Sequence, residues 1–336
     1  MDSKKVLWKS DETCLVTGGC GFIGSHLVRE LADQGRNVIA YDFNPDVSYL
    51  ADCLDKVKFV YGDVANMAHL MGVMADYKVN VVFHLGYMLV PDTDNRTGRA
   101  IQVNCAGFQN VMEAARILKI RRVVWASSQA VYGFAEGYPV TPISEDVHVN
   151  PTTQYGACKL FNEHVARYYW QQHGVDNIGL RKPVVYGLGK SRRRDLSISH
   201  RLIENAIVGR PVEVPPADFH ANYVYVKDIV RAYIFAMQAP PTKHIIFNIN
   251  GYAYRCSEVV EILRGLFPDL LVSNVKSLDT PNPIDAYDLS PIRAREELGY
   301  EPAYALADGV RDFLNARKEL GHMYTSSSYD YDVTPL

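Results

Sequence analysis

Short apolar runs alternate with longer amphipathic stretches through the first half of the chain. The apolar runs are rich in β-branched residues, and we expect strands at Cys14–Thr17, Val38–Asp42, Lys58–Tyr61, Val81–Leu85, Val123–Ser127 and Ile178–Val185. Helical patterns lie between them, for example at Phe22–Gln34, Gly98–Leu118 and Gln154–His173. Apolar strands that alternate with helices are typical of a parallel sheet covered on both faces. The pattern therefore predicts an α/β fold with a doubly wound, Rossmann-type sheet.

This alternation ends after Tyr186. A basic, glycine-containing segment precedes an expected helix at Leu196–Val208, a proline-rich loop follows it, and shorter mixed elements continue to about Leu320. We therefore expect a first domain over residues 1–186, to which residues 222–250 return, and a smaller mixed α/β lobe over residues 187–320. The polar stretch 321–336 has no periodicity and predicts a mobile tail.

Composition narrows the class of protein. The chain has 336 residues, 48% hydrophobic and 22% charged, with a formal net charge of -3, so neither a disordered chain nor a nucleic-acid or membrane partner is indicated. No apolar run is long enough to span a bilayer, and the charged first residues are unlike a secretory signal. The cysteines occur singly, without a CxxC pair or a Cys/His cluster. Reduced thiols in a cytoplasmic protein without a metal site are therefore expected.

A glycine-rich loop joins the first strand to the first helix. Gly18, Gly21 and Gly24 are spaced as GxxGxxG, with Phe22 and Ile23 opening the helical pattern. Such glycines allow a tight turn, a close approach of backbone N–H groups to a pyrophosphate, and close helix packing. The helix N-terminus then adds unpaired N–H groups and a positive dipole end. A plain turn is the alternative, but the position between strand and helix favours dinucleotide binding.

Two carboxylates end neighbouring strands. Asp42 is placed to accept hydrogen bonds from the adenosine ribose and to repel a 2′-phosphate, which predicts NAD rather than NADP as cofactor. The alternative for Asp42 is a turn before Asn44 and Pro45. Asp63, followed by Val64, is placed to reach the adenine amino group, although a capping role would explain it equally well.

Tyr155 and Lys159 stand four residues apart at the start of a helical pattern, so they share one helix face. A free tyrosine is a poor base at neutral pH, and a nearby lysine ammonium favours its phenolate. Tyr155 would then exchange a proton with a substrate hydroxyl while hydride passes to or from the cofactor. Ser127 and Ser128 end the fifth strand, where a hydroxyl can bind the substrate oxygen.

Together these motifs resemble the extended short-chain dehydrogenase/reductase family of NAD-dependent epimerases and dehydratases. The resemblance covers nearly the whole chain and rests on the glycine loop, Gly62-Asp63-Val64, His84-Leu85-Gly86, Asn104, Ser127–Gly133, Tyr155-xxx-Lys159, Val185-Tyr186-Gly187 and Tyr225–Asp228. It implies that Ser128, Tyr155 and Lys159 are catalytic, with Asn104 in the same hydrogen-bonded neighbourhood. It also implies that Leu85, Gly86, Ser127 and Pro183 line the cofactor. A homodimer built by the helices after residues 98 and 153 is a further implication.

Departures from the family pattern concern the substrate. Gln129 and Ala130 replace the Asp-Glu pair of dehydratases, so the acid and base for dehydration are missing. Val184 stands where nucleotide-sugar enzymes have Asn, Ala221 where they have an Arg, and residues 282–285 lack another Arg. Each lost charge-assisted contact to a phosphate is worth roughly 1.5–3 kcal/mol.

The sequence therefore favours an oxidoreductase that acts on a small sugar, sugar acid or polyol. Candidate substrate residues are Tyr87, Gln129, Arg192 and Arg193, although the arginine run 192–194 is equally well explained as a solvated basic patch. Phe134 and Tyr186 are further candidates for the pocket wall. The alternative is a nucleotide-sugar 4-epimerase that retains NAD, and a remote alternative is a non-catalytic NAD-binding sensor.

Overall fold

The computed structural model describes residues 11–133, 142–190, 198–214, 218, 220–274 and 288–324. Seven parallel strands form the central sheet in the order β10-β6-β5-β4-β1-β2-β3. Their bounds are β1 Thr13–Thr17, β2 Asn37–Asp42, β3 Val57–Tyr61, β4 Val79–His84, β5 Arg122–Ser128, β6 Asn177–Lys182 and β10 Ile246–Asn248. The chain runs outward from β1 in both directions, so the crevice between β1 and β4 is a topological switch point, where such sheets bind their ligands.

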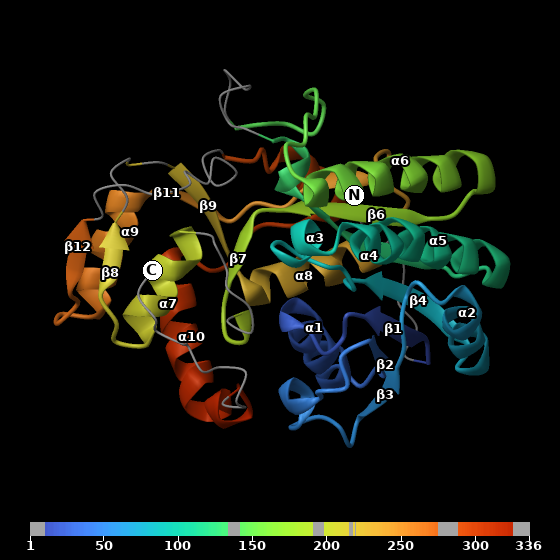
Figure 1. The fold of residues 1–336 in the computed structure, drawn as a ribbon, viewed down its shortest axis with the longest axis horizontal. Coiled ribbons are helices and arrows are strands. Elements are labelled where there is room, and N and C mark those ends of the chain that lie inside the picture. The colour runs from blue at the N-terminus through green and yellow to red at the C-terminus, as the bar shows by residue number, and fades with distance from the viewer. Residues whose placement is uncertain are drawn as a thin grey trace, which may run out of the picture.

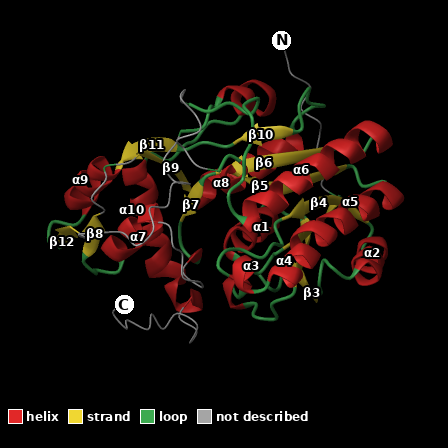
Figure 2. Ribbon diagram, turned by 45° about the horizontal axis from the view of Figure 1, so that its top comes forward, coloured by secondary structure: helices red, strands yellow, loops and turns green. Residues whose placement is uncertain are grey.

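Helices cover both faces of this sheet (Figures 1 and 2). Helices α1 (Phe22–Asp33) and α8 (Val226–Gln238) pack on one face. Helices α2 (Met67–Asp76), α5 (Gly107–Leu118) and α6 (Gln154–His173) pack on the other. The central strands are buried almost throughout, because apolar side chains on both faces meet helices. The predicted doubly wound α/β fold is confirmed.

A smaller lobe lies beside the carboxyl edge of the sheet (Figure 1). It contains a three-stranded sheet, β11-β9-β7, and a two-stranded sheet, β12-β8. Its strands are β7 Val184–Tyr186, β8 Val212–Val214, β9 His220–Tyr225, β11 Tyr252–Arg255 and β12 Val272–Asn274, and its helices are α7 Ile198–Ile207, α9 Cys256–Leu266 and α10 Leu306–Leu320. A 3₁₀ turn at Gly321–Tyr324 follows α10.

Two predicted elements are wrong in their continuity. The strand expected at Ile178–Val185 divides at Pro183, which has no N–H to donate, and β7 pairs with β9 of the smaller lobe. The helix expected at Gly98–Leu118 is α4 (Thr97–Ile101), a π-helical turn (Gln102–Ala106) and α5. The π-turn carries Asn104, whose amide binds the backbone of Met88, and such turns are frequent at functional sites.

Within the described residues, no helix is long and apolar enough to cross a membrane. No cluster of three His, Cys, Asp or Glu side chains suited to a metal ion occurs among them either. Several sequence predictions lie outside the described residues. These concern Phe134, the arginines 192–194, residues 282–285 and residues 325–336 of the expected tail.

Candidate active site

The glycine loop between β1 and α1 is packed too closely for larger residues. Gly18 has φ +70°, and a Cβ built there would lie 2.8 Å from the backbone of Leu85 and Gly86. A Cβ on Gly24 would lie 2.0 Å from the carbonyl oxygen of Gly18. The loop therefore folds back on itself and against the end of β4, which brings the start of α1 to the carboxyl edge of the sheet.

The first turn of α1 fits an anionic ligand. Its N-cap is Gly21, which has no side chain to cap the helix, and the first turn carries no acidic residue. The N–H groups at the start of a helix have no partner within it, and the helix dipole adds positive potential. This arrangement suits a pyrophosphate.

Asp42 lies at the end of β2, beside this loop. Its carboxylate accepts the N–H of Cys20 at 2.9 Å and the N–H of Asn44 at 2.9 Å. The bond to Asn44 forms the turn that was the alternative prediction for Asp42. The bond to Cys20 joins the carboxylate to the glycine loop. Both observations are compatible with a ribose ligand, since a carboxylate has about four acceptor sites.

Asp63 has partners within the protein that the sequence did not predict. Its carboxylate is paired with Arg99 and also accepts the N–H of Ala65. Arg99 in turn lies 5.6 Å from the ring centroid of Phe43, which is exposed and stacks near Tyr61. A hollow of about 530 Å³ beside this pair is lined by Asp63, Ala65, Asn66, Met67, Arg99, Gln102 and Ala106. Sequence reasoning missed Arg99 and Phe43, because they meet only in the folded chain.

Ser128 and Tyr155 come together because α6 begins directly against the end of β5. Thr153 caps α6 by accepting the N–H of Gly156 at 3.0 Å. A Cβ on Gly156 would lie 2.4 Å from the carbonyl oxygen of Ala130, so a larger residue would push the helix away. This close approach brings Tyr155 near enough to Ser128 for the serine to lower the pKa of its phenol. Both side chains are buried.

Burial favours the protonated form of Tyr155. It raises the pKa of the phenol, and Ser128 lowers that pKa only in part. Lys159 is not among the groups that shift the pKa of Tyr155, so its effect on the phenolate stays a prediction. The lysine Nζ lies 5.4 Å from the Tyr155 ring centroid, and its hydrogen bond goes elsewhere.

Lys159 is completely buried in a pocket made by neighbouring groups. Its Nζ donates to the carbonyl oxygen of Ala126 at 2.6 Å and lies 2.8 Å from the centroid of the Tyr87 ring. Burial, followed by the charge of Lys182, holds the pKa of the Lys159 ammonium well below its ordinary value. The Tyr87 ring partly offsets this desolvation by a cation–π contact. Tyr87, predicted as a substrate residue, thus packs on Lys159, which was predicted to be catalytic.

The end of β4 is held from two sides. The side chain of Thr17 accepts the N–H of Gly86 at 3.2 Å and contacts His84 Nδ1 at 2.7 Å. The amide of Asn104 accepts the N–H of Met88 at 2.8 Å and donates to its carbonyl oxygen at 3.0 Å. Asn104 therefore positions the segment that follows Leu85, rather than bonding to the catalytic side chains directly.

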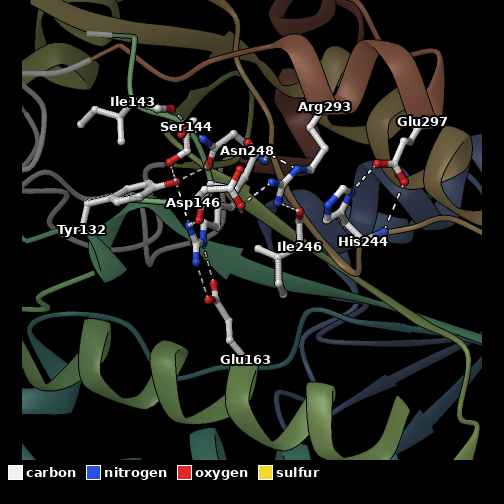
Figure 3. Close-up of polar contacts among 12 residues, drawn as sticks. Tyr132, Ile143, Ser144, Asp146, Glu163, His244, Ile246, Asn248, Arg293 and Glu297 are labelled. Atoms are coloured by element: carbon white, nitrogen blue, oxygen red, sulfur yellow. Dashed lines mark hydrogen bonds and ion pairs between the residues drawn. The ribbon is translucent and has the colours of Figure 1, made fainter. Parts of the chain in front are cut away.

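A buried polar network that includes Glu163, Tyr132 and Asn248 lies near the end of β5 (Figure 3). Ser127 donates to Glu163 at 2.6 Å, and Glu163 forms a two-point ion pair with Arg181 at 2.8 and 2.7 Å. Arg181 also donates to the hydroxyl of Tyr132 at 2.8 Å, which donates to Asn248 at 2.7 Å. The hydroxyl of Ser127 is thus committed to Glu163, which leaves its backbone for the predicted contact with the cofactor.

The substrate side of the site carries little charge in the described residues. Val184 in β7 pairs with Tyr223 in β9, and Ala221 of β9 is buried. The amide of Asn222 donates to Asp288 at 2.6 Å and accepts the N–H of Gly251 at 2.6 Å. Gln129 is buried in the 3₁₀ turn after β5, and Pro183 is buried between β6 and β7. The predicted substrate residues Arg192 and Arg193 lie outside the described residues.

Comparison with known proteins identifies this arrangement. Residues 14–250 match the NAD dependent epimerase/dehydratase family. The chain belongs to that family. As a family member, it is an NAD-dependent enzyme with a Rossmann-type fold, as the resemblance implied. The open first turn of α1 and the Asp42 carboxylate fit that cofactor.

Individual members of the family give closer comparisons. A UDP-glucose 4-epimerase of Mycolicibacterium smegmatis is 31% identical over 309 residues, which cover 88% of this chain and 95% of that protein. The structure of MoeE5 in complex with UDP-glucose and NAD has a TM-score of 0.75 at 30% identity, covering 92% of this chain and 99% of that one. A GalE-like L-threonine dehydrogenase from Cupriavidus necator, in its holo form, shares the fold with a TM-score of 0.79 at 24% identity, covering 90% and 99%.

Proposed function

We propose that this chain is a 4-epimerase of a nucleotide-linked sugar and that it retains NAD through the catalytic cycle. The observation that carries the proposal is the placement of Ser128 and Tyr155, which are both buried where α6 begins against the end of β5, in a chain that is 31% identical to a UDP-glucose 4-epimerase. The sequence favoured oxidation of a small substrate over epimerisation, and the comparisons support the opposite order.

The proposed chemistry needs one proton and one hydride to move at a single carbon. NAD, when bound, supplies the hydride acceptor and a positive charge beside the phenol. Tyr155 would take the proton of the sugar hydroxyl while its carbon is oxidised to a ketone. It would return the proton after the keto sugar has rotated to present its other face. Ser128 donates a hydrogen bond to the same oxygen. Because burial raises the pKa of Tyr155, positive charge next to it is required for this role.

We assign the cofactor contacts by position. The first-turn N–H groups of Phe22, Ile23 and Gly24 would hold the pyrophosphate, and Asp42 would hold the adenosine ribose. Lys159 lies on the same helix face as Tyr155, and its ammonium would bind the ribose next to the nicotinamide. The carboxylate of Asp63 already pairs with Arg99, which leaves it fewer acceptor positions for the adenine amino group.

A dehydrogenase that releases reduced NAD is the second candidate. The observation in its favour is the lack of charge at Val184, Ala221 and Asn222, where nucleotide-sugar enzymes would offer contacts to the nucleotide. Such an enzyme would use the same three catalytic residues on a small polyol or sugar acid.

The two candidates differ in what happens to NAD. The purified protein is incubated with UDP-glucose without added NAD, and UDP-galactose is measured by chromatography. Conversion without accumulation of reduced cofactor supports the epimerase. Stoichiometric reduction of added NAD by a free sugar or sugar acid, with no conversion of UDP-sugars, would replace it by the second candidate.

Two variants test the catalytic assignment. Tyr155→Phe removes the proton-transferring hydroxyl and is expected to lower kcat by about 10²–10⁴-fold. Ser128→Ala removes one hydrogen bond to the reacting oxygen, with an expected loss of about 10²–10³-fold. Both should retain NAD, which is measured after acid release. Unchanged turnover in Tyr155→Phe would show that the reacting proton goes elsewhere.

We also propose a homodimer that uses α5 and α6. Large apolar side chains on these helices remain exposed, namely Ile117 45%, Phe161 43%, Tyr168 55% and Trp170 36%. Such a patch on adjacent helices is typical of a protein interface. Sedimentation analysis is expected to give a dimer that Phe161→Asp weakens, and a monomeric wild-type protein would contradict the proposal.

A further inference from the structure

Two exposed aromatic rings and an arginine meet at the carboxyl ends of β2 and β3. Phe43 directly follows β2, and Tyr61 is the last residue of β3, the neighbouring strand. Their ring centroids lie 5.8 Å apart, with the ring planes 33° from parallel. Arg99, which comes from α4, places its guanidinium carbon 5.6 Å from the centroid of the Phe43 ring. Three separate segments of the chain therefore form one cluster, and the proposed catalytic chemistry uses none of these side chains.

The cluster keeps much of its aromatic surface open. Phe43 is 58% exposed and Tyr61 is 53% exposed, so their contacts cover only part of each ring. A single exposed aromatic residue is common and needs no explanation. Here two rings and a cation contact one another, and Arg99 is also fixed by an ion pair with Asp63. The ring of Phe43 is therefore held in place and offers a surface on which a flat group can stack.

The position of the cluster matches the expected position of the adenine of NAD. Asp42, which would hold the adenosine ribose, directly precedes Phe43 and is the register partner of Tyr61. Adenine is bonded to that ribose, so the base must lie close to the ends of β2 and β3. The hollow of about 530 Å³ that Asp63 and Arg99 help to line opens beside this cluster. Its volume is in the usual range for a small-molecule site, about 300–1,000 Å³.

Asp63 and Arg99 differ in the hydrogen-bonding capacity that they have left for a base. The Asp63 carboxylate already accepts the N–H of Ala65 and is paired with Arg99. A guanidinium has five N–H donors, and among the described residues the only other acceptor for Arg99 is Gln102, at 3.5 Å. The ring nitrogens of adenine are hydrogen-bond acceptors, and its amino group is a donor. Arg99 therefore has donors left for the base, whereas Asp63 would have to accept a third donor.

We propose that Phe43 and Arg99 recognise the adenine of NAD, with the base stacked on the Phe43 ring and a ring nitrogen accepting a hydrogen bond from Arg99. Asp63 is then a positioning residue, because it holds the guanidinium rather than the adenine amino group. Stacking of a base on an aromatic ring changes affinity on the order of 10- to 100-fold. Because the amino group is not read, hypoxanthine, which lacks it and keeps the ring nitrogens N3 and N7, is bound as well as adenine.

The first experiment compares two dinucleotides and requires no turnover. The full-length protein is freed of bound cofactor and titrated by calorimetry with NAD and with nicotinamide hypoxanthine dinucleotide, in which a carbonyl oxygen replaces the adenine amino group. We expect dissociation constants that agree within about threefold. Weaker binding of the hypoxanthine analogue beyond this factor would contradict the proposal, because an acceptor such as Asp63 would then read the amino group. Since no sugar is present, failure of the epimerase proposal leaves this result unaffected.

The second experiment repeats both titrations on variants, with thermal unfolding as a check that each variant is folded. Phe43→Ala and Arg99→Met are expected to weaken the binding of both dinucleotides at least about tenfold. Tyr77→Ala, at the exposed C-cap of α2, and Arg264→Met, in an exposed ion pair of α9, are the matched controls and should leave both affinities unchanged. Asp63→Asn should weaken both dinucleotides by the same factor, as expected of a positioning residue. Unchanged affinity in Phe43→Ala or Arg99→Met, or a loss confined to NAD in Asp63→Asn, would overturn the proposal.

Discussion

The buried ion pair between Glu163 and Arg181 offers a direct test of how the catalytic edge is held. The two side chains are only 3% and 5% exposed, and two hydrogen bonds join them. Glu163, labelled in Figure 3, also accepts the hydroxyl of Ser127, which directly precedes the candidate catalytic residue Ser128. Replacing Glu163 with Gln keeps the size of the side chain but leaves the guanidinium without its counter-ion.

The expected cost follows from this burial. Removing one partner of a buried ion pair destabilises a protein by about 3–5 kcal/mol, because an uncompensated charge stays in the interior. We expect a loss of this size in the free energy of unfolding for Glu163→Gln. The double variant Glu163→Leu with Arg181→Met removes both charges and should lose less than the sum of the single variants. Its remaining cost comes from two hydroxyls, because Ser127 loses its acceptor and Tyr132 no longer receives a hydrogen bond from Arg181.

The assay is urea unfolding followed by circular dichroism. The wild type, Glu163→Leu, Arg181→Met and the double variant form the cycle, and Glu163→Gln is measured under the same conditions. Arg311→Gln serves as a control, because that arginine and its partner Asp308 are 59% and 61% exposed, and exposed pairs contribute about 0–1 kcal/mol. The reasoning is refuted if Glu163→Gln costs less than about 1 kcal/mol, or if the losses of the single variants simply add in the double variant.

Three further predictions concern the cofactor loop, pH and the catalytic lysine. Gly24→Ala places a Cβ 2.0 Å from the carbonyl oxygen of Gly18, so NAD affinity should fall at least about tenfold; equal affinity by calorimetry would contradict this. Burial lowers the pKa of His26 to about 4 and of His84 to about 3, so the unfolded chain binds their protons first as pH falls below about 6.5. Above that pH the two histidines do not reduce the free energy of unfolding. Between pH 7 and 5, the free energy of unfolding measured with urea should fall by about 2 kcal/mol per histidine, and a flat pH profile would contradict this. Tyr87→Leu removes the ring that lies 2.8 Å from the Nζ of Lys159, a contact worth about 2 kcal/mol when desolvated. The kcat of Tyr87→Leu should fall roughly tenfold with a shifted pH profile, while the kcat of Tyr87→Phe stays within a few-fold of the wild type. Equal behaviour of the two variants would refute the role of this contact.

The fold was predictable because its signals are local. Six strands of the large sheet coincide with apolar runs that were predicted as strands, β10 (Ile246–Asn248) was not predicted, and the helix Gln154–His173 was predicted with its observed ends. The errors occurred where the backbone hydrogen-bonding pattern changes within a strand or a helix. Pro183 lacks an N–H and ends β6, so the chain leaves the large sheet for the smaller lobe. The π-turn at Gln102–Ala106 adds no hydrophobic signal of its own, so its residues look like ordinary helix.

The candidate site was predictable only for side chains that local spacing brings together. Tyr155 and Lys159 share a helix face, and Ser128 ends a neighbouring strand, so their meeting follows from the fold class. The partners of these residues come from elsewhere in the chain. Nothing around Tyr87 in the sequence indicates that its ring packs on Lys159. A single charged residue within an apolar strand, Arg181, was the one available signal for the buried network.

The charge of the substrate lobe now separates the two candidate functions more sharply than the sequence did. In β9, Ala221 is buried, Asn222 is hydrogen-bonded to Asp288 and Gly251, and His220 is exposed. None of the three provides an arginine in any register. A nucleoside diphosphate would therefore need its phosphate charge matched by another part of the chain, and direct titration with UDP measures that requirement without any turnover.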